Sequence, residues 1–441
     1  MEIFYCAQGA EREPLQIPAA NLYVTKPKPS SFGRVTLMVS SVVGAIMVAI
    51  LIGMALEMAA RPPGFDFRYF WVAGRLWLDG VSPYGNDIAA QAGVMIGDGH
   101  VPVIWPYPPT LWLPTVILAV FPFEVAWKVW LALHVLMMIG GSALVAVGLP
   151  RLRLTLGRRD IVVSRPLFFS VHLALMTFAE AHLFAFFNGQ MTALFYLGAV
   201  VMLVGLSRGR DAASTAGLTI LMMKPHIGAA VALGLLISGA RGRRIVVGAG
   251  LLSCVLMLPA LAIAPTVISD WLYSLGRYDG VSAVNRPEAM TGLRNLVQIL
   301  GHVSIGNATA ALAGLAVAAC VALRLKQWYA VPGGGHSTLP ESVWITHLGA
   351  AMILIALAVS PLHIYDFLLI GVLLPLIPLR RPARSVIALV ALAVMWIASP
   401  LCEMLGGTAA SPLLAGTTVT TIAAAMLIPF AFSRHYLQPA R

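Results

Sequence analysis

The sequence consists largely of long apolar runs, and no other feature limits its fold as strongly. A helix needs about 20 apolar residues to cross the hydrocarbon core of a bilayer. The first run is 35–56, and eleven more follow it: 108–121, 125–148, 166–184, 190–207, 212–238, 245–264, 304–323, 343–360, 365–379, 386–400 and 412–432. Of the 441 residues, 59% are hydrophobic and 11% are charged, whereas soluble domains average about 45–50% and 25%. These values exclude a soluble enzyme, a disordered chain and a fibrous protein.

The runs predict an all-α fold, a polytopic integral membrane helical bundle with about 10–13 membrane helices. Such a bundle grows as one unit, so we expect a single transmembrane domain over 35–432. Residues 1–34 are polar and contain four prolines, which predicts a flexible cytoplasmic arm, and 433–441 are expected to form a cytoplasmic tail. The run 35–56 is longer than the about 7–15 apolar residues of a signal peptide, so we interpret it as a retained anchor.

The basic residues predict the orientation, because Lys and Arg collect in the cytoplasmic loops of membrane proteins. The net charge is +11, and 20 of the 29 Lys and Arg lie in seven clusters. These clusters are Lys26/Lys28/Arg34, Arg151/Arg153/Arg158/Arg159/Arg165, Arg208/Arg210, Arg241/Arg243/Arg244, Arg324/Lys326, Arg380/Arg381/Arg384 and Arg434/Arg441. All seven face one side, with both termini in the cytoplasm, if 108–121 does not fully cross the membrane and 212–238 is a hairpin. In the alternative arrangement 108–121 crosses, and the five arginines of the second cluster lie outside.

The preferred arrangement makes 57–107 the first external loop and 265–303 another external loop. Twelve of the 18 acidic residues then lie on the external side or at its edge, so we expect any active site to face outward. In the first loop, Phe67, Phe70 and Trp71 recur at helical spacing. This pattern predicts an amphipathic helix at the membrane interface, with its aromatic rings at the depth of the lipid headgroups.

Asp66 is the first candidate for a reactive side chain. It stands between Phe65 and Phe67, just past the end of the first apolar run. Apolar surroundings raise the pKa of a carboxyl group toward the range of a useful base. The alternative interpretation is an ordinary solvated helix end.

Lys224 is the second candidate, because it interrupts the 27 mostly apolar residues of 212–238. A lysine in lipid is costly, and Pro225 frees backbone groups that are tolerated only inside protein or around a cavity. The alternative is a lysine that extends from a hairpin tip to the interface. His363 and Asp366 lie three residues apart and share one face if a helix has begun there; the alternative is a helix cap beside a histidine.

Five short motifs follow one another along the chain. They are Asp-Phe-x-Tyr-Phe-Trp-x-Ala-Gly-Arg-x-x-x-x-Gly-x-x-Pro-Tyr at 66–84, Tyr107-Pro108-Pro109, Asn188-Gly189-Gln190, Lys224-Pro225, and Ser360-Pro361 with Tyr365-Asp366. In this order the set resembles family 87 of the glycosyltransferases. The resemblance implies a bundle of the GT-C type with interfacial helices in the first external loop. It also implies a polyprenyl-phosphate-sugar as the donor, as in mannosyltransferases of the bacterial envelope.

The resemblance implies roles for single residues. Asp66 corresponds to the acid that is taken as the catalytic base, which removes the proton of the acceptor hydroxyl in an inverting transfer. The leaving group is a lipid phosphate, so the site needs cations and hydrogen-bond donors more than a general acid. The candidates for binding the donor phosphate are Lys224, His226, His363, Arg68, Arg75 and Arg294. The candidates for binding the acceptor or the sugar are Asp366, Gln190 and Tyr107. For His226 the alternative is a structural role at the hairpin tip, and for Arg294 it is a solvated loop.

The sequence also predicts the cofactors and partners. Arg68 stands where a metal-binding Asp-x-Asp motif would have its second acid, so we expect no metal and no other cofactor. No Gly-rich phosphate loop follows a strand, which agrees with a donor that arrives through the bilayer. The expected partners are the polyprenyl-phosphate-sugar, a lipid or glycan acceptor and membrane lipids, and nucleic acid is not among them.

We therefore predict an integral membrane glycosyltransferase. It would transfer a hexose, mannose-like, to a lipid or glycan acceptor at the periplasmic or external face of a bacterial inner membrane. One alternative is a transporter or flippase of lipid-linked sugars, since broken helices and intramembrane ions are also features of transporters. Another is a non-catalytic assembly factor that retains the fold.

Overall fold

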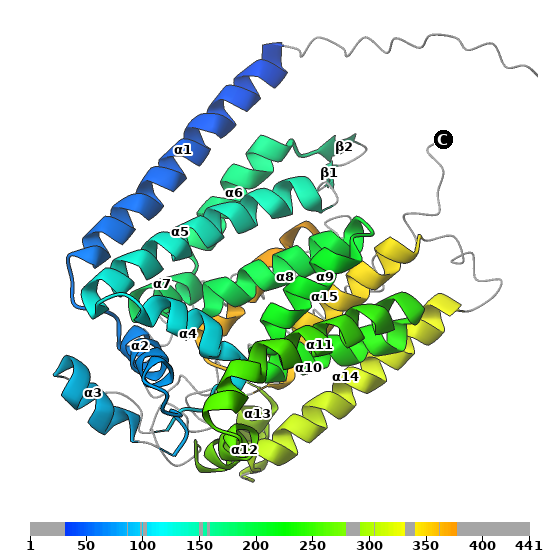
Figure 1. Ribbon diagram of the computed structural model, residues 1–441. Helices are drawn as coiled ribbons and strands as arrows, with labels where there is room; N and C mark the ends of the chain where they lie inside the picture. Colours follow the sequence, from blue (N-terminus) through cyan, green and yellow to red (C-terminus); the bar gives the residue numbers. More distant parts are fainter. Residues whose placement is uncertain are drawn as a thin grey trace, which may run out of the picture.

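The computed structural model describes residues 31–376, except 86, 98, 100–103, 150–152, 157–158, 279–291, 304, 331–339 and 361. Most of its elements are helices (Figure 1). In chain order the elements are α1 (Ser31–Ala59), α2 (Phe65–Leu78), α3 (Ile88–Ile96), η1 (Pro109–Leu111), α4 (Trp112–Ala119), α5 (Phe123–Gly148), β1 (Arg153–Leu156), β2 (Arg159–Val162), α6 (Arg165–Phe178), α7 (Glu180–Asn188), α8 (Thr192–Ser207), α9 (Asp211–Met222), α10 (Pro225–Ser238), α11 (Ala240–Ile263), α12 (Val267–Tyr278), α13 (Leu293–Gly301), α14 (Asn307–Ala330), α15 (Glu341–Val359) and η4 (Ile364–Leu376). Most of the predicted arm and the whole predicted tail, 433–441, lie outside the described residues.

In the described part of the chain, five helices are long and apolar enough to cross a membrane: Arg34–Ala59 in α1, α5, α11, Thr309–Gln327 in α14, and α15. The pair α6 and α7, bent by 61°, makes a sixth if it counts as one span. Shorter apolar helices accompany them, namely Pro109–Ala119, α8, α10 and Ile364–Leu373. The predicted all-α polytopic membrane bundle is therefore confirmed. The runs 386–400 and 412–432 lie outside the described residues, so the total of about 10–13 membrane helices stays a prediction.

A short antiparallel hairpin of β1 and β2 stands between α5 and α6. Arg153 pairs with Val162, and Leu156 pairs with Arg159. This hairpin is absent from the elements predicted above, although Arg and Leu alternate over 151–154 with the period of two that is typical of a strand.

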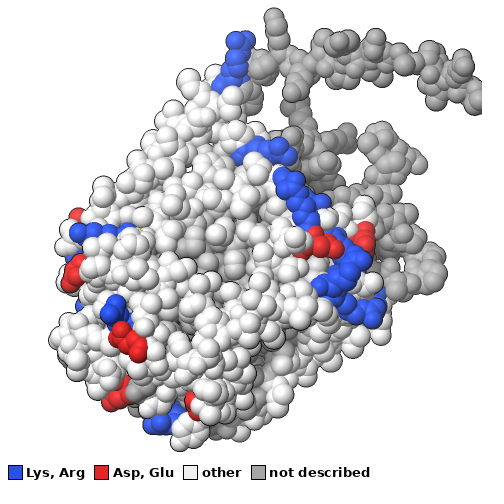
Figure 2. Space-filling model, in the orientation of Figure 1, with Lys and Arg blue, Asp and Glu red and all other residues white. Residues whose placement is uncertain are grey.

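Hydrogen bonds between helix ends define a basic end of the bundle. Arg208, directly after α8, donates to the carbonyl of Val147 near the end of α5 (2.5 Å). Arg241, at the start of α11, donates through Nε to Asp211 Oδ1 at the start of α9 (2.7 Å). Because α10 ends just before Arg241, the chain over 212–238 returns to the end that it left, which is the predicted hairpin. Figure 2 shows Lys and Arg side chains gathered on the upper right of the molecule, near the ends of α8 and α9 in Figure 1.

The first predicted external loop and α12 meet at the opposite end. Trp127, near the start of α5, donates through Nε1 to the carbonyl of Met58 at the end of α1 (3.0 Å). Ser274 of α12 donates to the carbonyl of Trp105 (2.9 Å). The described residues of the loop 57–107 therefore lie at the end of the bundle away from the basic clusters around α9 and α11.

The run 108–121 folds into η1 and the short helix α4. The eight residues of α4 rise about 12 Å, far less than the about 30 Å of a hydrocarbon core. The carbonyl of Phe121, just after α4, accepts a hydrogen bond from Trp71 Nε1 (3.1 Å), so α4 stays beside α2. The shortness of α4 agrees with the preferred arrangement, in which 108–121 does not fully cross, and that arrangement stays a prediction.

Helix α2 is present where an amphipathic helix was predicted, but its aromatic rings do not face lipid headgroups. Phe67, Phe70 and Trp71 are buried in the protein. The ring of Phe67 lies 5.1 Å from that of Trp127 in α5, and the ring of Phe70 lies 5.0 Å from that of Tyr107. This is a correction to the prediction. The rings pack on α5 and on 104–107, because these segments offer aromatic surfaces that the amphipathic pattern could not reveal.

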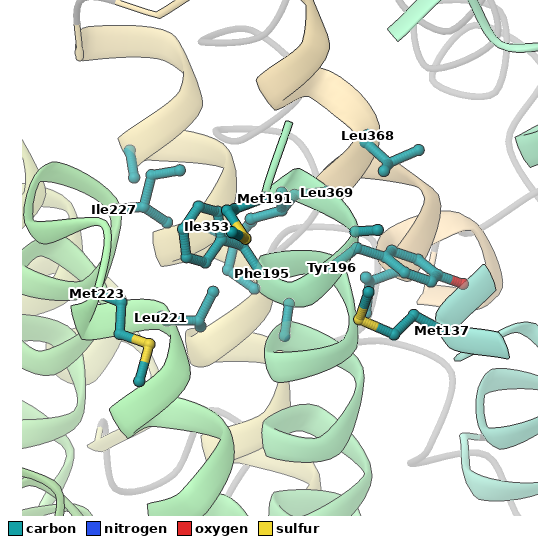
Figure 3. Close-up of a cluster of buried hydrophobic side chains, with 14 of the residues drawn as sticks. Met137, Met191, Phe195, Tyr196, Leu221, Met223, Ile227, Ile353, Leu368 and Leu369 are labelled. Carbon is teal, nitrogen blue, oxygen red and sulfur yellow. The ribbon is translucent and has the colours of Figure 1, made fainter. Parts of the chain in front are cut away.

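The core surrounds α8, which is apolar on every side and buried along most of its length. Figure 3 shows Phe195 and Tyr196 of α8 among residues of the hairpin α9–α10, of α15 and of η4. A Cβ on Gly217 of α9 would stand 2.4 Å from the backbone N of Met202 in α8, so the two helices approach with almost no side chain between them. Close backbone packing of this kind is typical of membrane helices. It fixes the position of α9 along the length of α8.

Candidate active site

Four breaks between helices bring polar side chains together at the end away from the basic clusters. Asp66 lies in the first turn of α2, Gln190 lies between α7 and α8, and Lys224 lies between α9 and α10. Asp366 lies in the first turn of η4, which follows α15. Each side chain therefore comes from a place where regular helix stops, as expected for polar groups within a membrane bundle.

The centre of the site is an ion pair between Lys224 Nζ and Asp366 Oδ1. Both residues are buried, with exposed fractions of 7% and 1%. The backbone explains the position of Lys224: it precedes Pro225, and its carbonyl accepts the N–H groups of Ile227 and Gly228 (both 3.0 Å), so it caps α10. A lysine that extended to the interface would not be buried in this way. That alternative for Lys224 is therefore wrong.

Two aromatic rings complete the surroundings of the Lys224 ammonium. Its Nζ stands 5.6 Å from the ring centre of Phe195 and 5.3 Å from that of Tyr365. A cation over a ring face is attracted to it, most strongly where water is excluded. Tyr365 belongs to a motif noted in the sequence, but nothing in the apolar run of α8 distinguished Phe195.

Asp66 belongs to the same electrostatic group. Burial raises the pKa of its carboxyl from 3.8 to about 6, a hydrogen bond from Gln190 and the charge of Lys224 lower this pKa, and the charge of Asp366 raises it. The side chain of Asp66 is only partly buried, whereas Gln190 is 3% exposed. The residue keeps part of its surface accessible, while Gln190 holds its carboxyl group from the protein side.

Two glycines allow α2 to come this close to α7. A Cβ on Gly64 would stand 2.4 Å from the carbonyl oxygen of Phe187, and a Cβ on Gly189 would stand 2.5 Å from Cβ of Phe67. Gly189 also ends α7 with a φ of 71°, a conformation that favours glycine. Because neither glycine carries a Cβ, α2 and α7 pack closely enough for Gln190 to reach the Asp66 carboxyl.

Two histidines border the ion pair. The ring of His363 lies 5.2 Å from that of Tyr365. Burial lowers the pKa of His363 to about 4, with Asp366 raising it and Lys224 lowering it, so the ring is neutral at pH 7. The carbonyl of His226 accepts from Ser360 Oγ (3.4 Å). The buried His226 Nε2 has no hydrogen-bond partner among the residues that the structure describes.

The other predicted residues lie elsewhere around α2 and α13. Arg68 donates through Nε to the carbonyl of Pro63 (3.0 Å). Arg75 pairs with Asp79 at the exposed end of α2 (3.5 Å), about 13 Å along the helix from Asp66. Arg294 is buried on α13, with an exposed fraction of 8%, and the ring of Tyr107 packs on Phe70. The phosphate-binding roles of Arg68, Arg75 and Arg294 and the sugar-binding role of Tyr107 stay predictions.

Metal binding has no obvious place in the described part of the chain. Among these residues no three His, Cys, Asp or Glu side chains gather closely enough to hold an ion. The Lys224 ammonium pairs with Asp366, and its charge also acts on Asp66, so it partly neutralises both carboxylates. The independence from metal stays a prediction.

The comparison with known families identifies this arrangement. A model of glycosyltransferase family 87 matches residues 105–361, more than half of the chain. The chain belongs to glycosyltransferase family 87. It is a membrane glycosyltransferase and uses a sugar donor and an acceptor. The match contains Gln190 and Lys224, while Asp66 and Asp366 lie outside it on either side. No curated protein and no solved structure matches the chain.

Proposed function

We propose that this family 87 glycosyltransferase takes a hexose, mannose-like, from a polyprenyl-phosphate-sugar and transfers it with inversion to a lipid or glycan acceptor. The reaction takes place at the periplasmic or external face of a bacterial inner membrane, with Asp66 as the general base. The observation that carries the proposal is the Asp66 carboxyl with a raised pKa beside the buried ion pair of Lys224 and Asp366.

The reaction needs one proton transfer and one displacement at the anomeric carbon. Asp66 accepts the proton of the acceptor hydroxyl, and the acceptor oxygen forms a bond to the anomeric carbon. The bond between that carbon and the phosphate oxygen breaks, and its electron pair leaves with the polyprenyl phosphate. The phosphate thereby gains one negative charge, which Lys224 stabilises. The ring N–H groups of His226 and of the neutral His363 are further donors to the same phosphate.

A single ionised carboxylate suits this chemistry. The leaving phosphate needs no proton, so the pair of carboxyl groups used by glycoside hydrolases is unnecessary. Asp366 is occupied by Lys224, which leaves Asp66 as the base. A pKa of about 6 keeps Asp66 mostly ionised at pH 7 and makes it a stronger base than an ordinary aspartate. In the proposal, Gln190, Tyr107 and Asp366 contact the sugar or the acceptor.

The test is Asp66→Asn in membranes supplied with a radiolabelled lipid-linked sugar. We expect transfer to fall by at least about 100-fold, the usual contribution of a positioned base. The control is Asp79→Asn, the same substitution at the exposed end of the same helix, which should leave transfer unchanged. Normal transfer by a well-expressed Asp66→Asn protein would reject the assigned base. Movement of a lipid-linked sugar across proteoliposomes without any transfer would instead support a flippase.

A further inference from the structure

Helix α12 (Val267–Tyr278) has three chemically different sides. It follows α11 after only three residues and lies at the lower end of the bundle in Figure 1, away from the start of α1. Because a helix turns by about 100° per residue, its side chains can be assigned to sides from the sequence and checked against their exposure.

The first side faces protein. Val267 is fully buried and Ser274 is 5% exposed. Trp271, between them on this side, donates through Nε1 to the carbonyl of Pro106 (2.9 Å), and Ser274 donates to the carbonyl of Trp105 (2.9 Å). These bonds fix the rotation of α12 about its own axis.

The second side is apolar and uncovered. Ile268, Leu272 and Leu275 are 42%, 57% and 36% exposed. Their spacing of four and three residues places them in one stripe along the helix. A stripe of large aliphatic side chains without a cover is costly in water.

The third side is polar. Arg277 is exposed and stands 5.7 Å from the ring centre of Tyr273, which is itself 69% exposed. Asp270 accepts a hydrogen bond from Thr266 Oγ1 (2.8 Å). Arg277 points roughly 140° away from Leu272 around the helix axis. Helix α12 thus has one side that packs on protein, one aliphatic side and one polar side.

The aliphatic stripe continues a surface that already faces lipid. Helix α11 is long and apolar enough to span the membrane, and on it Val247, Leu251, Val255 and Leu258 are exposed along one face. Such a face on a membrane span lies against acyl chains. Since α12 begins three residues beyond α11, it starts at the boundary of the membrane. Its 12 residues rise only about 18 Å, too little to cross.

We infer that α12 lies in the plane of the membrane surface and docks on lipid. Ile268, Leu272 and Leu275 insert among the lipid chains, while Asp270, Tyr273 and Arg277 lie among the headgroups and water, the arrangement of an interfacial helix. Through Trp271 and Ser274 the docked helix holds the segment 104–107, whose Tyr107 packs on α2. Binding of α12 to the lipid surface thus helps to position the first loop. This inference does not depend on the proposed donor or base.

The inference is tested with the full chain in phospholipid vesicles. A nitroxide is attached to Leu272→Cys, or in a matched protein to Arg277→Cys, after replacement of the four natural cysteines by serine. Collisions with oxygen, which concentrates in lipid, are compared with collisions with a water-soluble nickel chelate. We expect the label at 272 to favour oxygen by several-fold and the label at 277 to favour the chelate, and Leu275→Cys should repeat the result for 272. A label at 272 that favours the chelate, or that neither reagent reaches because other protein covers it, would overturn the inference.

Discussion

At the scale of single residues, the elevated pKa of Asp66 makes a direct prediction about activity. The value of about 6 means that the proposed base becomes protonated well before an ordinary aspartate does. The ratio kcat/KM should therefore be constant above pH 7 and fall tenfold per pH unit below about 6, because only the ionised carboxylate accepts a proton. Transfer assays between pH 4.5 and 8 measure this profile. A profile that stays flat down to pH 5 would contradict the assignment of Asp66.

The buried pair of Lys224 and Asp366 makes a second prediction at this scale. Lys224→Met should abolish transfer and lower stability by about 3–5 kcal/mol, because it leaves the Asp366 carboxylate buried without a partner. Adding Asp366→Leu removes that charge as well, so the double variant should recover most of the lost stability.

Measurement of the melting temperature and of transfer in both variants separates the two roles of the pair. A double variant that regains its melting temperature but not its activity shows that the pair takes part in the reaction and not only in folding. If the double variant also transferred sugar, Lys224 would have no part in the chemistry. Arg241→Met offers a control, since its partner Asp211 lies at the basic end and is more exposed, so stability should fall less and transfer should persist.

These residues also show how far the sequence predicts the site. Asp66 and Lys224 could be recognised singly, because charges beside or within apolar runs are costly and need a reason. The pairing of Lys224 with Asp366 joins residues 142 positions apart, and it depends on how the helices pack. Phe195 looks like any other apolar residue of α8, so its contact with the ammonium could not be predicted at all.

At the scale of elements, the site depends on helix ends that stop at defined places, and Gly189 is the sharpest example. It has a φ of 71°, and a Cβ there would stand 2.5 Å from Phe67 and 2.8 Å from Trp127. Gly189→Ala should force α2 away from α7, break the contact between Gln190 and Asp66, and greatly reduce transfer. Gly209 has the same φ of 71° but nothing within 4 Å of a Cβ.

Gly209→Ala is therefore the matched control for Gly189→Ala. Both variants bear the strain of a left-handed residue with a Cβ, about 1 kcal/mol, but only Gly189→Ala has the steric contact as well. We expect a clearly larger drop in melting temperature and a loss of transfer for Gly189→Ala alone. Equal effects of the two substitutions would mean that the fit between α2 and α7 does not matter.

The elements also show which predictions from periodicity succeed. The break at Lys224-Pro225 was predictable, because proline cannot continue a helix and a lysine interrupts the apolar run. Helix α2 was placed correctly, but its aromatic rings were assigned to the membrane surface and instead pack on Trp127 and Tyr107. Periodicity reveals that a helix has an apolar side. It does not reveal whether lipid or another part of the chain covers that side. For α12 this question was answered by the exposed fractions of its side chains in the structure.

At the scale of the whole molecule, the charges of the described residues separate the two ends of the bundle. The arginines around α9 and α11 lie at one end, and the group around Asp66 and Lys224 lies at the other. This separation could be predicted from the sequence. Lys and Arg collect in cytoplasmic loops, so the positions of the basic clusters indicate which chain segments lie on the same side of the membrane. A lipid-linked donor would then reach the site sideways through the leaflet that borders the end carrying Asp66.

The orientation itself yields the last prediction. Val81, exposed just after α2, and Arg243, exposed on α11, lie at opposite ends of the bundle. With the natural cysteines replaced, a membrane-impermeant maleimide should label Val81→Cys in intact cells and Arg243→Cys only after the membrane is opened. The reverse pattern would place the site in the cytoplasm and exclude the proposed external reaction. Labelling of both positions from outside would mean that the two ends are not separated by the membrane, because a bundle that spans it cannot expose both ends to the same solution.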